Sequence, residues 1–187
     1  MHRSVDMSSA TPLVTAEELE RRPRDDSRYE LIEGRVVRMS PVGFEHGQIV
    51  TRLLVLIQQH LQRQPAGVVL TGVGFKLASQ PDTVRAPDVA FVRGERVPSP
   101  APKGFFEGPP DLAVEVRSPE ERRSDLQRKV NAYLSAGVPL VVIVDPDDRS
   151  ATCSRQLARP VTFRSGDRLD LGDVIPGFTC QVSEIFP

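Results

Sequence analysis

The fold is decided by residues 111–144, which read DLAVEVRSPEERRSDLQRKVNAYLSAGVPLVVIV. Alternating apolar residues over 112–116 predict a strand, and apolar residues at helical spacing predict a helix over 124–136. A Ser-x-x-Gln capping box opens this helix and Gly137 ends it. The unbroken apolar run over 140–144 is typical of a strand buried on both faces. A strand, a helix and a strand within this length predict a βαβ unit with two parallel strands.

The flanking sequence predicts further elements on both sides of this unit. Apolar residues three and four positions apart predict a strong amphipathic helix from about His46 to Gln62. Before this helix, the sequence predicts a short helix capped at Thr15 and stopped by Pro23, and a hairpin over Tyr29–Met39 with its turn at Glu33-Gly34. After it, strands are expected over Val68–Leu77 and Val84–Val92, followed by a loop over Val97–Pro110. Two or three short antiparallel strands over Ala151–Phe186 are expected to extend the sheet.

The order of these elements predicts an α/β (α+β) fold. A mixed central sheet is flanked by two main helices, with a hairpin at the N-terminal side and antiparallel strands at the C-terminal side. Residues 1–13 are expected to form a flexible tail, and residues 14–187 a single domain.

The composition limits the class of protein. The chain has 187 residues, 39% hydrophobic and 26% charged, which is typical of a globular domain and excludes a disordered chain or a coiled coil. No apolar run approaches the ~18 residues that span a bilayer. Cys153 and Cys180 are expected to be free thiols in a reducing cytoplasm, with one disulfide as the alternative. Because the net charge is −1, a nucleic-acid partner requires a local basic patch, a metal or another protein.

Several familiar catalytic motifs are missing from the sequence. It contains no phosphate-binding Gly-x-x-x-x-Gly-Lys loop, no complete dinucleotide fingerprint and no Gly-x-Ser-x-Gly nucleophile elbow. The histidines His2, His46 and His60 have no metal-ligand spacing on one helical turn. The acidic residues are therefore the main candidates for chemistry.

Two solitary acids stand out because each lies within an apolar predicted strand. Asp88 occurs in VRAPDVAFV and Glu115 in DLAVEV. A buried, unpaired carboxylate costs several kcal/mol, so these acids require arginine partners, an open sheet face or a hard cation. Lys129 lies at the border of the apolar stripe of the following helix. Its ammonium either reaches the two carboxylates or pairs with Asp125 one turn earlier.

A set of motifs, in order along the chain, resembles the Uma-two family, a large bacterial family of "putative restriction endonucleases". The motifs are Tyr29–Gly34 (YELIEG), His46 at the start of the long helix, Arg85–Val89 (RAPDV), Asp111–Pro119 (DLAVEVRSP), Asp125-x-x-x-Lys129-x-x-x-Tyr133, and Ala136–Pro139 (AGVP) with Asp145-Pro146. The resemblance runs from about Thr15 to Phe186. It implies a restriction-endonuclease-like fold of the PD-(D/E)xK nuclease superfamily.

The resemblance also implies a site. Asp88 and Glu115 would be metal ligands, joined by the main-chain carbonyl of Val116 around Mg²⁺ or Mn²⁺. The lysine that the superfamily places two residues after the glutamate is Arg117 here, whereas Lys129 matches a lysine position on the following helix. Asp88, Glu115 and Lys129 are thus the expected catalytic set, and whether Arg117 takes the lysine's role stays open.

Two further residues, Glu30 and His46, match family positions as possible accessory groups. The alternative for Glu30 is a purely structural role in a salt bridge of the hairpin. For His46 it is a helix N-terminal residue hydrogen-bonded to a loop.

The implied function is Mg²⁺-dependent cleavage of DNA phosphodiester bonds. Cleavage of both strands of a duplex would require two sites and therefore a homodimer. A catalytically silent nuclease-fold module that binds a partner protein or nucleic acid is the alternative that the near-neutral charge favours. A hydrolase acting on a smaller phosphate ester is a third hypothesis.

Overall fold

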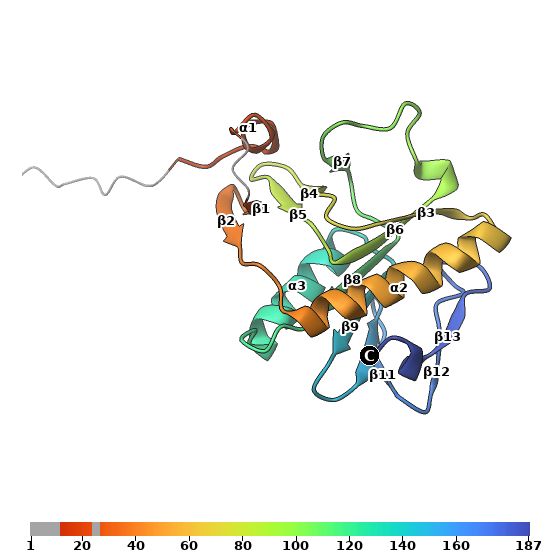
Figure 1. Cartoon of the computed structure of the whole chain (residues 1–187). Coiled ribbons are helices and arrows are strands. Elements are labelled where there is room, and N and C mark those ends of the chain that lie inside the picture. Colours follow the sequence, from red (N-terminus) through yellow and green to blue (C-terminus); the bar gives the residue numbers. More distant parts are fainter. Residues whose placement is uncertain (1–11, 24–26) are drawn as a thin grey trace, which may run out of the picture.

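The computed structural model describes residues 12–23 and 27–187 (Figure 1). Most of the tail expected at residues 1–13 lies outside the described residues. The helices are α1 (Ala16–Glu20), α2 (Phe44–Arg63) and α3 (Arg123–Ser135), with short 3₁₀ turns at Gly94–Arg96 and Val182–Glu184. The strands are β1 (Arg28–Ile32), β2 (Arg35–Met39), β3 (Gly67–Leu70), β4 (Phe75–Ala78), β5 (Thr83–Arg85), β6 (Val89–Arg93), β7 (Phe106–Glu107), β8 (Leu112–Val116), β9 (Leu140–Asp145), β10 (Ser150–Ser154), β11 (Val161–Arg164), β12 (Arg168–Asp170) and β13 (Thr179–Gln181).

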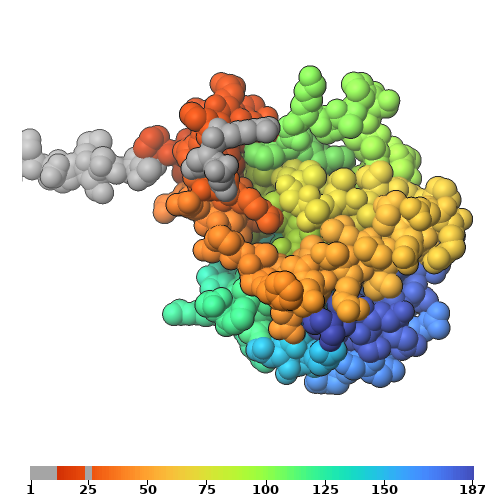
Figure 2. All heavy atoms as spheres, in the orientation of Figure 1, coloured from red at the N-terminus to blue at the C-terminus, as the bar shows by residue number. Residues whose placement is uncertain are grey.

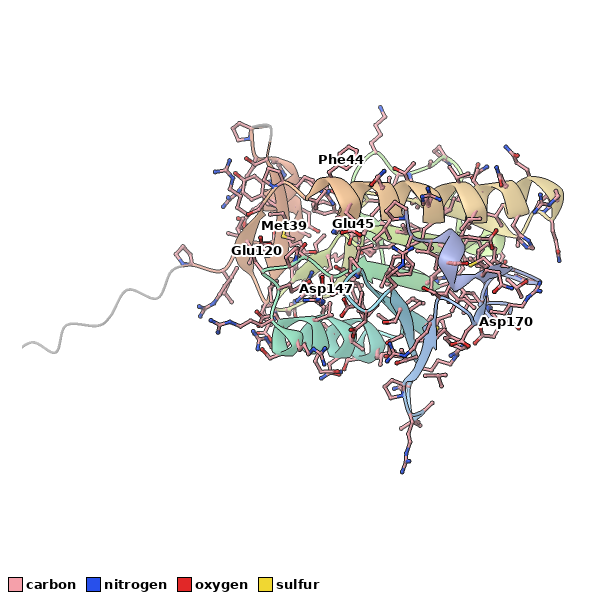
Figure 3. The ribbon with its side chains drawn as sticks, turned by 60° about the horizontal axis from the view of Figure 1, so that its bottom comes forward. Met39, Phe44, Glu45, Glu120, Asp147 and Asp170 are labelled. Carbon is pink, nitrogen blue, oxygen red and sulfur yellow. The ribbon has the colours of Figure 1, made fainter. Side chains whose placement is uncertain are left out.

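The largest sheet has six strands in the order β11-β10-β9-β8-β6-β3. Strands β8 and β9 are parallel and joined by α3, which confirms the predicted βαβ unit. Helix α2 packs on one face of this sheet against Val89, Val114 and Val142, while α3 packs on the other face against Ala113 and Val141 (Figure 3). Because both faces are covered, residues 140–144 are all buried, as the apolar run predicts.

A second, five-stranded sheet has the order β2-β1-β5-β4-β7. Its first two strands form the predicted hairpin, whose two-residue turn places Glu33 at φ 49° and Gly34 at φ 74°. Positive φ at both central residues is the geometry of a tight hairpin turn. Helix α1 packs beside this sheet, and the side chain of its N-cap residue, Thr15, accepts a hydrogen bond from the backbone N–H of Glu18 in a complete capping box, as expected.

The prediction of single strands over Val68–Leu77 and Val84–Val92 is wrong. Each segment consists of two short strands that belong to different sheets: β3 and β4 in the first, β5 and β6 in the second. Gly72 at φ 67° lies between β3 and β4, and Pro87, which has no N–H to donate to a ladder, lies between β5 and β6. Because apolar and polar residues alternate within each short strand, the sequence pattern of two such strands resembles that of one long strand. The predicted loop over 97–110 likewise contains β7.

Two boundaries differ from expectation. Helix α3 begins at Arg123 with Arg122 as N-cap and without a side-chain cap, so the expected capping box at Ser124 is wrong. The carbonyl of Arg122 already accepts hydrogen bonds from Asp125 and Leu126, which places Ser124 inside the first turn. Helix α2 also begins two residues earlier than predicted. At its other end, α3 stops before Gly137 at φ 94°, as expected.

The C-terminal strands extend the main sheet only in part. Strands β10 and β11 add to its edge, whereas β12 and β13 form a separate two-stranded ribbon. Residues after Leu169 pack into the core beneath α2. Cys153 and Cys180 are buried and free, as predicted. Within the described residues, no helix has the length and apolar character to cross a membrane.

Candidate active site

The passage of the chain from one sheet to the other positions Asp88. The expectation that Asp88 lies inside a strand is wrong, because β6 begins one residue later, after the break at Pro87. Val89 pairs with Val114 across the antiparallel strands β6 and β8, so Asp88 lies opposite Glu115 at the end of this pairing. The Oδ2 atom of Asp88 accepts a hydrogen bond of 2.9 Å from the backbone N–H of Val116. The two solitary acids therefore lie side by side.

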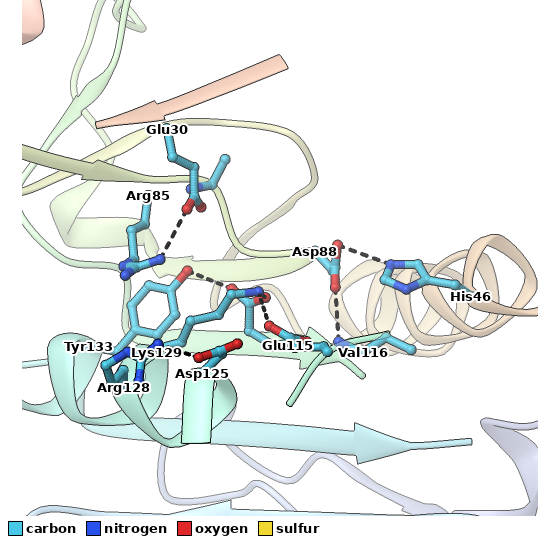
Figure 4. A network of polar contacts seen from close by, with 12 residues as sticks. Glu30, His46, Arg85, Asp88, Glu115, Val116, Asp125, Arg128, Lys129 and Tyr133 are labelled. Atoms are coloured by element: carbon cyan, nitrogen blue, oxygen red, sulfur yellow. Dashed lines mark hydrogen bonds and ion pairs between the residues drawn. The ribbon is translucent and has the colours of Figure 1, made fainter. Parts of the chain in front are cut away.

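Two side chains of α3 hold the carboxyl group of Glu115, which is 4% exposed (Figure 4). The Nζ atom of Lys129 lies 3.0 Å from Oε2, and the hydroxyl of Tyr133 donates a hydrogen bond of 2.7 Å to Oε1. Lys129 and Tyr133 are four residues apart, so both project from the same side of the helix. The structure thus brings together Asp88, Glu115 and Lys129.

Lys129 also contacts a second carboxylate, with Nζ 2.8 Å from Oε1 of Glu121. The alternative in which Lys129 pairs with Asp125 is wrong, because Asp125 pairs with Arg128 instead. The stem of Lys129 crosses the sheet surface and its ammonium enters the acidic cluster, which is the arrangement that the border position allows.

Burial and neighbouring charges have opposite effects on the pKa values of Glu115 and Lys129. Burial raises the pKa of Glu115; the ammonium of Lys129 opposes this rise, and the charges of Asp88 and Glu30 add to it. Burial alone would lower the pKa of Lys129, but the carboxylates of Glu115 and Glu121 outweigh it and raise the pKa. The carboxylates of Glu115 and Glu121 thus share the one ammonium of Lys129.

His46, in the first turn of α2, closes the site on the side of Asp88. Its Nε2 atom lies 3.1 Å from Oδ1 of Asp88, and the side chain is 8% exposed. Among the described residues, neither ring nitrogen has a hydrogen-bond partner in suitable geometry. The contact therefore has the distance of an ion pair without the angles of a hydrogen bond. A buried imidazole with unused nitrogens beside a carboxylate is a donor set that a divalent cation can use.

The donor set fits a hard cation in chemistry, because two carboxylates and a main-chain carbonyl are oxygen ligands of the kind that Mg²⁺ prefers. As the side chains stand, no three His, Cys, Asp or Glu residues of the described chain are close enough to enclose an ion. The two oxygens of Glu115 contact Lys129 and Tyr133 instead.

Glu30 reaches the same region from the hairpin. Its Oε2 atom lies 3.0 Å from Nη1 of Arg85, and its Oε1 atom accepts a hydrogen bond from the backbone N–H of Ala86. Both side chains of the ion pair are buried. The salt bridge expected for Glu30 thus links β1 to β5 rather than staying within the hairpin. It fixes the backbone two residues before Asp88.

Arg117 points away from Glu115. Its guanidinium donates to Asp145, at 2.9 Å from Nε, and also to Asp147. Asp111 does not contact Arg117 but accepts a hydrogen bond from Nη1 of Arg96 at 2.8 Å. The basic side chain that meets the glutamate is therefore Lys129.

Sequence reasoning named Tyr133 within a family motif but assigned it no contact in the site. A tyrosine in a core position requires a partner for its hydroxyl, and Tyr133 lies one turn after Lys129; these two facts were the available signal.

A cavity of about 920 Å³ lies elsewhere, lined by residues of α1, β3 and the loop 97–106, and contains none of the site's acids.

Comparisons with known proteins give the family and the fold of the chain. The family model Uma2, described as "Putative restriction endonuclease", matches residues 16–183. The chain is similar to a crystal structure from Anabaena variabilis described as "a putative nuclease belonging to DUF820", with 17% sequence identity and a TM-score of 0.81 over 92% of this chain and 97% of that one. This likeness confirms the fold that the sequence predicts. A search of curated proteins gave no match.

Proposed function

Because the chain belongs to the Uma2 family, whose model is described as "Putative restriction endonuclease", we propose that it hydrolyses DNA phosphodiester bonds with the aid of Mg²⁺ or Mn²⁺. The observation that carries the proposal is the meeting of Asp88, directly before β6, with Glu115 on the neighbouring strand β8, and the ammonium of Lys129 on Glu115. This Asp, Glu and Lys set is the combination that the sequence resemblance implies for a nuclease.

Asp88, Glu115 and the carbonyl of Val116 would hold the metal ion, and His46 is the nearest additional donor. When bound, Mg²⁺ would neutralise charge on the phosphate and lower the pKa of a coordinated water. The backbone N–H of Val116 fixes one oxygen of Asp88. The strand pairing holds both acids on rigid backbone, which suits the strict geometry of this cation.

The remaining groups act through charge and position. Lys129 would stabilise the negative charge that develops on the phosphate in the transition state. Tyr133 holds one oxygen of Glu115 by a hydrogen bond, which fixes the direction of the carboxylate. The buried ion pair between Glu30 and Arg85 fixes the backbone that leads to Asp88.

The test is a cleavage assay on plasmid and linear DNA with Mg²⁺ or Mn²⁺. Asp88→Ala and Lys129→Ala should abolish cleavage, while Lys103→Ala, which changes an exposed lysine outside the site, should retain it. Size-exclusion chromatography with light scattering tests the homodimer that duplex cleavage requires. If the wild-type chain leaves duplex, single-stranded and structured DNA intact with both metals, the proposal is refuted.

The near-neutral charge favours a second candidate, a silent module of nuclease fold that binds DNA or a protein. Titration calorimetry with Mg²⁺ separates the two functions. Metal binding that disappears in Asp88→Ala supports the enzyme, whereas the absence of binding at millimolar metal supports the module.

A further inference from the structure

One face of the β1–β2 hairpin is turned toward the site. Glu30 on β1 pairs with Val37 on β2, and its carboxylate reaches Arg85, two residues before the break that positions Asp88. Side chains two residues apart share a face of a strand. The face of Glu30 therefore also carries Arg28, and across the pairing it carries Arg35, which is opposite Ile32.

The two arginines of this face are exposed. Neither Arg28 nor Arg35 forms an ion pair with any described residue, and neither is buried. The acid between them, Glu30, is buried and already neutralised by Arg85. The face consequently presents two uncompensated positive charges, separated by roughly 13 Å along the strands, since four residues of strand span about this length.

The position of the hairpin makes these charges relevant to a substrate. In Figure 2 the hairpin, in orange, lies at the surface beside the N-terminal end of α2, the end that carries His46. In Figure 4, Glu30 extends from the hairpin toward the same cluster that α3 enters from the opposite side. A strand of DNA that reaches Asp88 would pass close to this face.

We propose that Arg28 and Arg35 bind the phosphate backbone of the DNA that enters the site, so that the hairpin face is one wall of the substrate track. This inference rests on the proposed nuclease function. A chain with net charge −1 gains little general attraction for DNA, so its affinity has to come from local cations such as these.

The experiment measures binding without cleavage. Fluorescence anisotropy of a labelled DNA duplex is recorded in EDTA at several salt concentrations, and the slope of log K against log salt is determined. Each phosphate contact adds about 0.9 to this slope. Arg28→Ala and Arg35→Ala should each reduce the slope by about 0.9, and the double variant by about 1.8. Arg28→Lys and Arg35→Lys, which keep the charge, should restore it.

Arg159→Ala is the matched control, because Arg159 is exposed in the connection between β10 and β11, outside the hairpin. Its slope should equal that of the wild type. Equal slopes for the wild type and the hairpin variants overturn the inference, and if the wild type still cleaves DNA the nuclease function stands. Variants that change the mass of the particle in light scattering instead of the slope would show a contact between two copies at edge strand β2, which also overturns it. A wild type that neither binds nor cleaves DNA contradicts both proposals.

Discussion

Replacement of Lys129 by methionine should destabilise the protein strongly, because the ammonium group of Lys129 forms ion pairs with two carboxylates. Its Nζ atom lies 3.0 Å from Glu115 and 2.8 Å from Glu121. Methionine keeps much of the apolar stem but removes the charge. Glu115, at 4% exposure, then loses its only cationic partner among the described residues, while the hydrogen bond from Tyr133 remains.

The cost follows from the burial of the pair. Breaking a buried ion pair by removing one partner costs about 3–5 kcal/mol when the other charge stays buried and uncompensated. Because burial already raises the pKa of Glu115, a proton on this carboxyl group would relieve part of that cost. Lys129 keeps 17% exposure of its side chain, so the lower end, about 3 kcal/mol, is expected. A second change, Glu115→Gln, removes the orphaned charge and should recover about 1–2 kcal/mol of this loss, as coupled neighbours do.

Urea unfolding followed by circular dichroism measures both quantities. With an m-value of about 2 kcal/mol per molar, Lys129→Met should lower the midpoint by roughly 1.5 M. Lys103→Met is the control, since Lys103 is exposed and has no ion pair with a described residue, and its midpoint should stay unchanged. A midpoint for Lys129→Met within error of the wild type, or a double variant no more stable than the single one, would refute the reasoning.

Three further outcomes are expected. Arg117→Ala should keep DNA cleavage, because its guanidinium is bound to two aspartates away from the site, and it should cost about 1–3 kcal/mol in urea unfolding; loss of cleavage in a folded variant would return Arg117 to the catalytic set. Tyr133→Phe should cost about 1–3 kcal/mol, because it leaves one oxygen of buried Glu115 without a donor; an unchanged midpoint would contradict this. Burial raises the pKa of Cys153 to about 11 and of Cys180 to about 12, so both thiols should resist a thiol reagent until urea unfolds the chain. Because these thiols ionise near 9.0 when unfolded, their contribution to stability is complete below that pH. It should be lost as the pH rises through about 11 for Cys153 and about 12 for Cys180. Rapid labelling of the native protein would contradict their burial.

The elements that the sequence predicts correctly have strong local signals. The βαβ unit follows from an apolar run too long and too uniform for an exposed strand, and the hairpin follows from Glu33-Gly34. The two split strands were beyond such reasoning, because alternation is a property of neighbours along the chain. It contains no information on which sheet each short strand joins.

The sequence was enough to predict which residues form the candidate site, but not which of their side chains contact one another. Two lone acids and a lysine at the border of a stripe were enough to expect a cluster of Asp88, Glu115 and Lys129. The contact of His46 with Asp88 joins residues 42 positions apart in sequence number, and the partners of Arg117 lie at the end of β9 and just after it. Such long-range pairings depend on the packing of α2 and β9, which periodicity does not determine.

The crossing of the chain at Pro87 has a consequence for how activity is lost. The six-stranded sheet contains the large core, whereas the outer sheet is held by two smaller clusters. One is built around Leu19, Leu31 and Val84, and in the other Phe75 and Phe106 pack against β6. Parts of a protein with fewer buried contacts open at lower free energy than the rest. If the outer sheet detaches first, the contacts of Glu30 with the residues before Asp88 are lost while the core remains intact. Inactivation by mild denaturant should therefore precede global unfolding, so that the molecule passes through a compact but inert form.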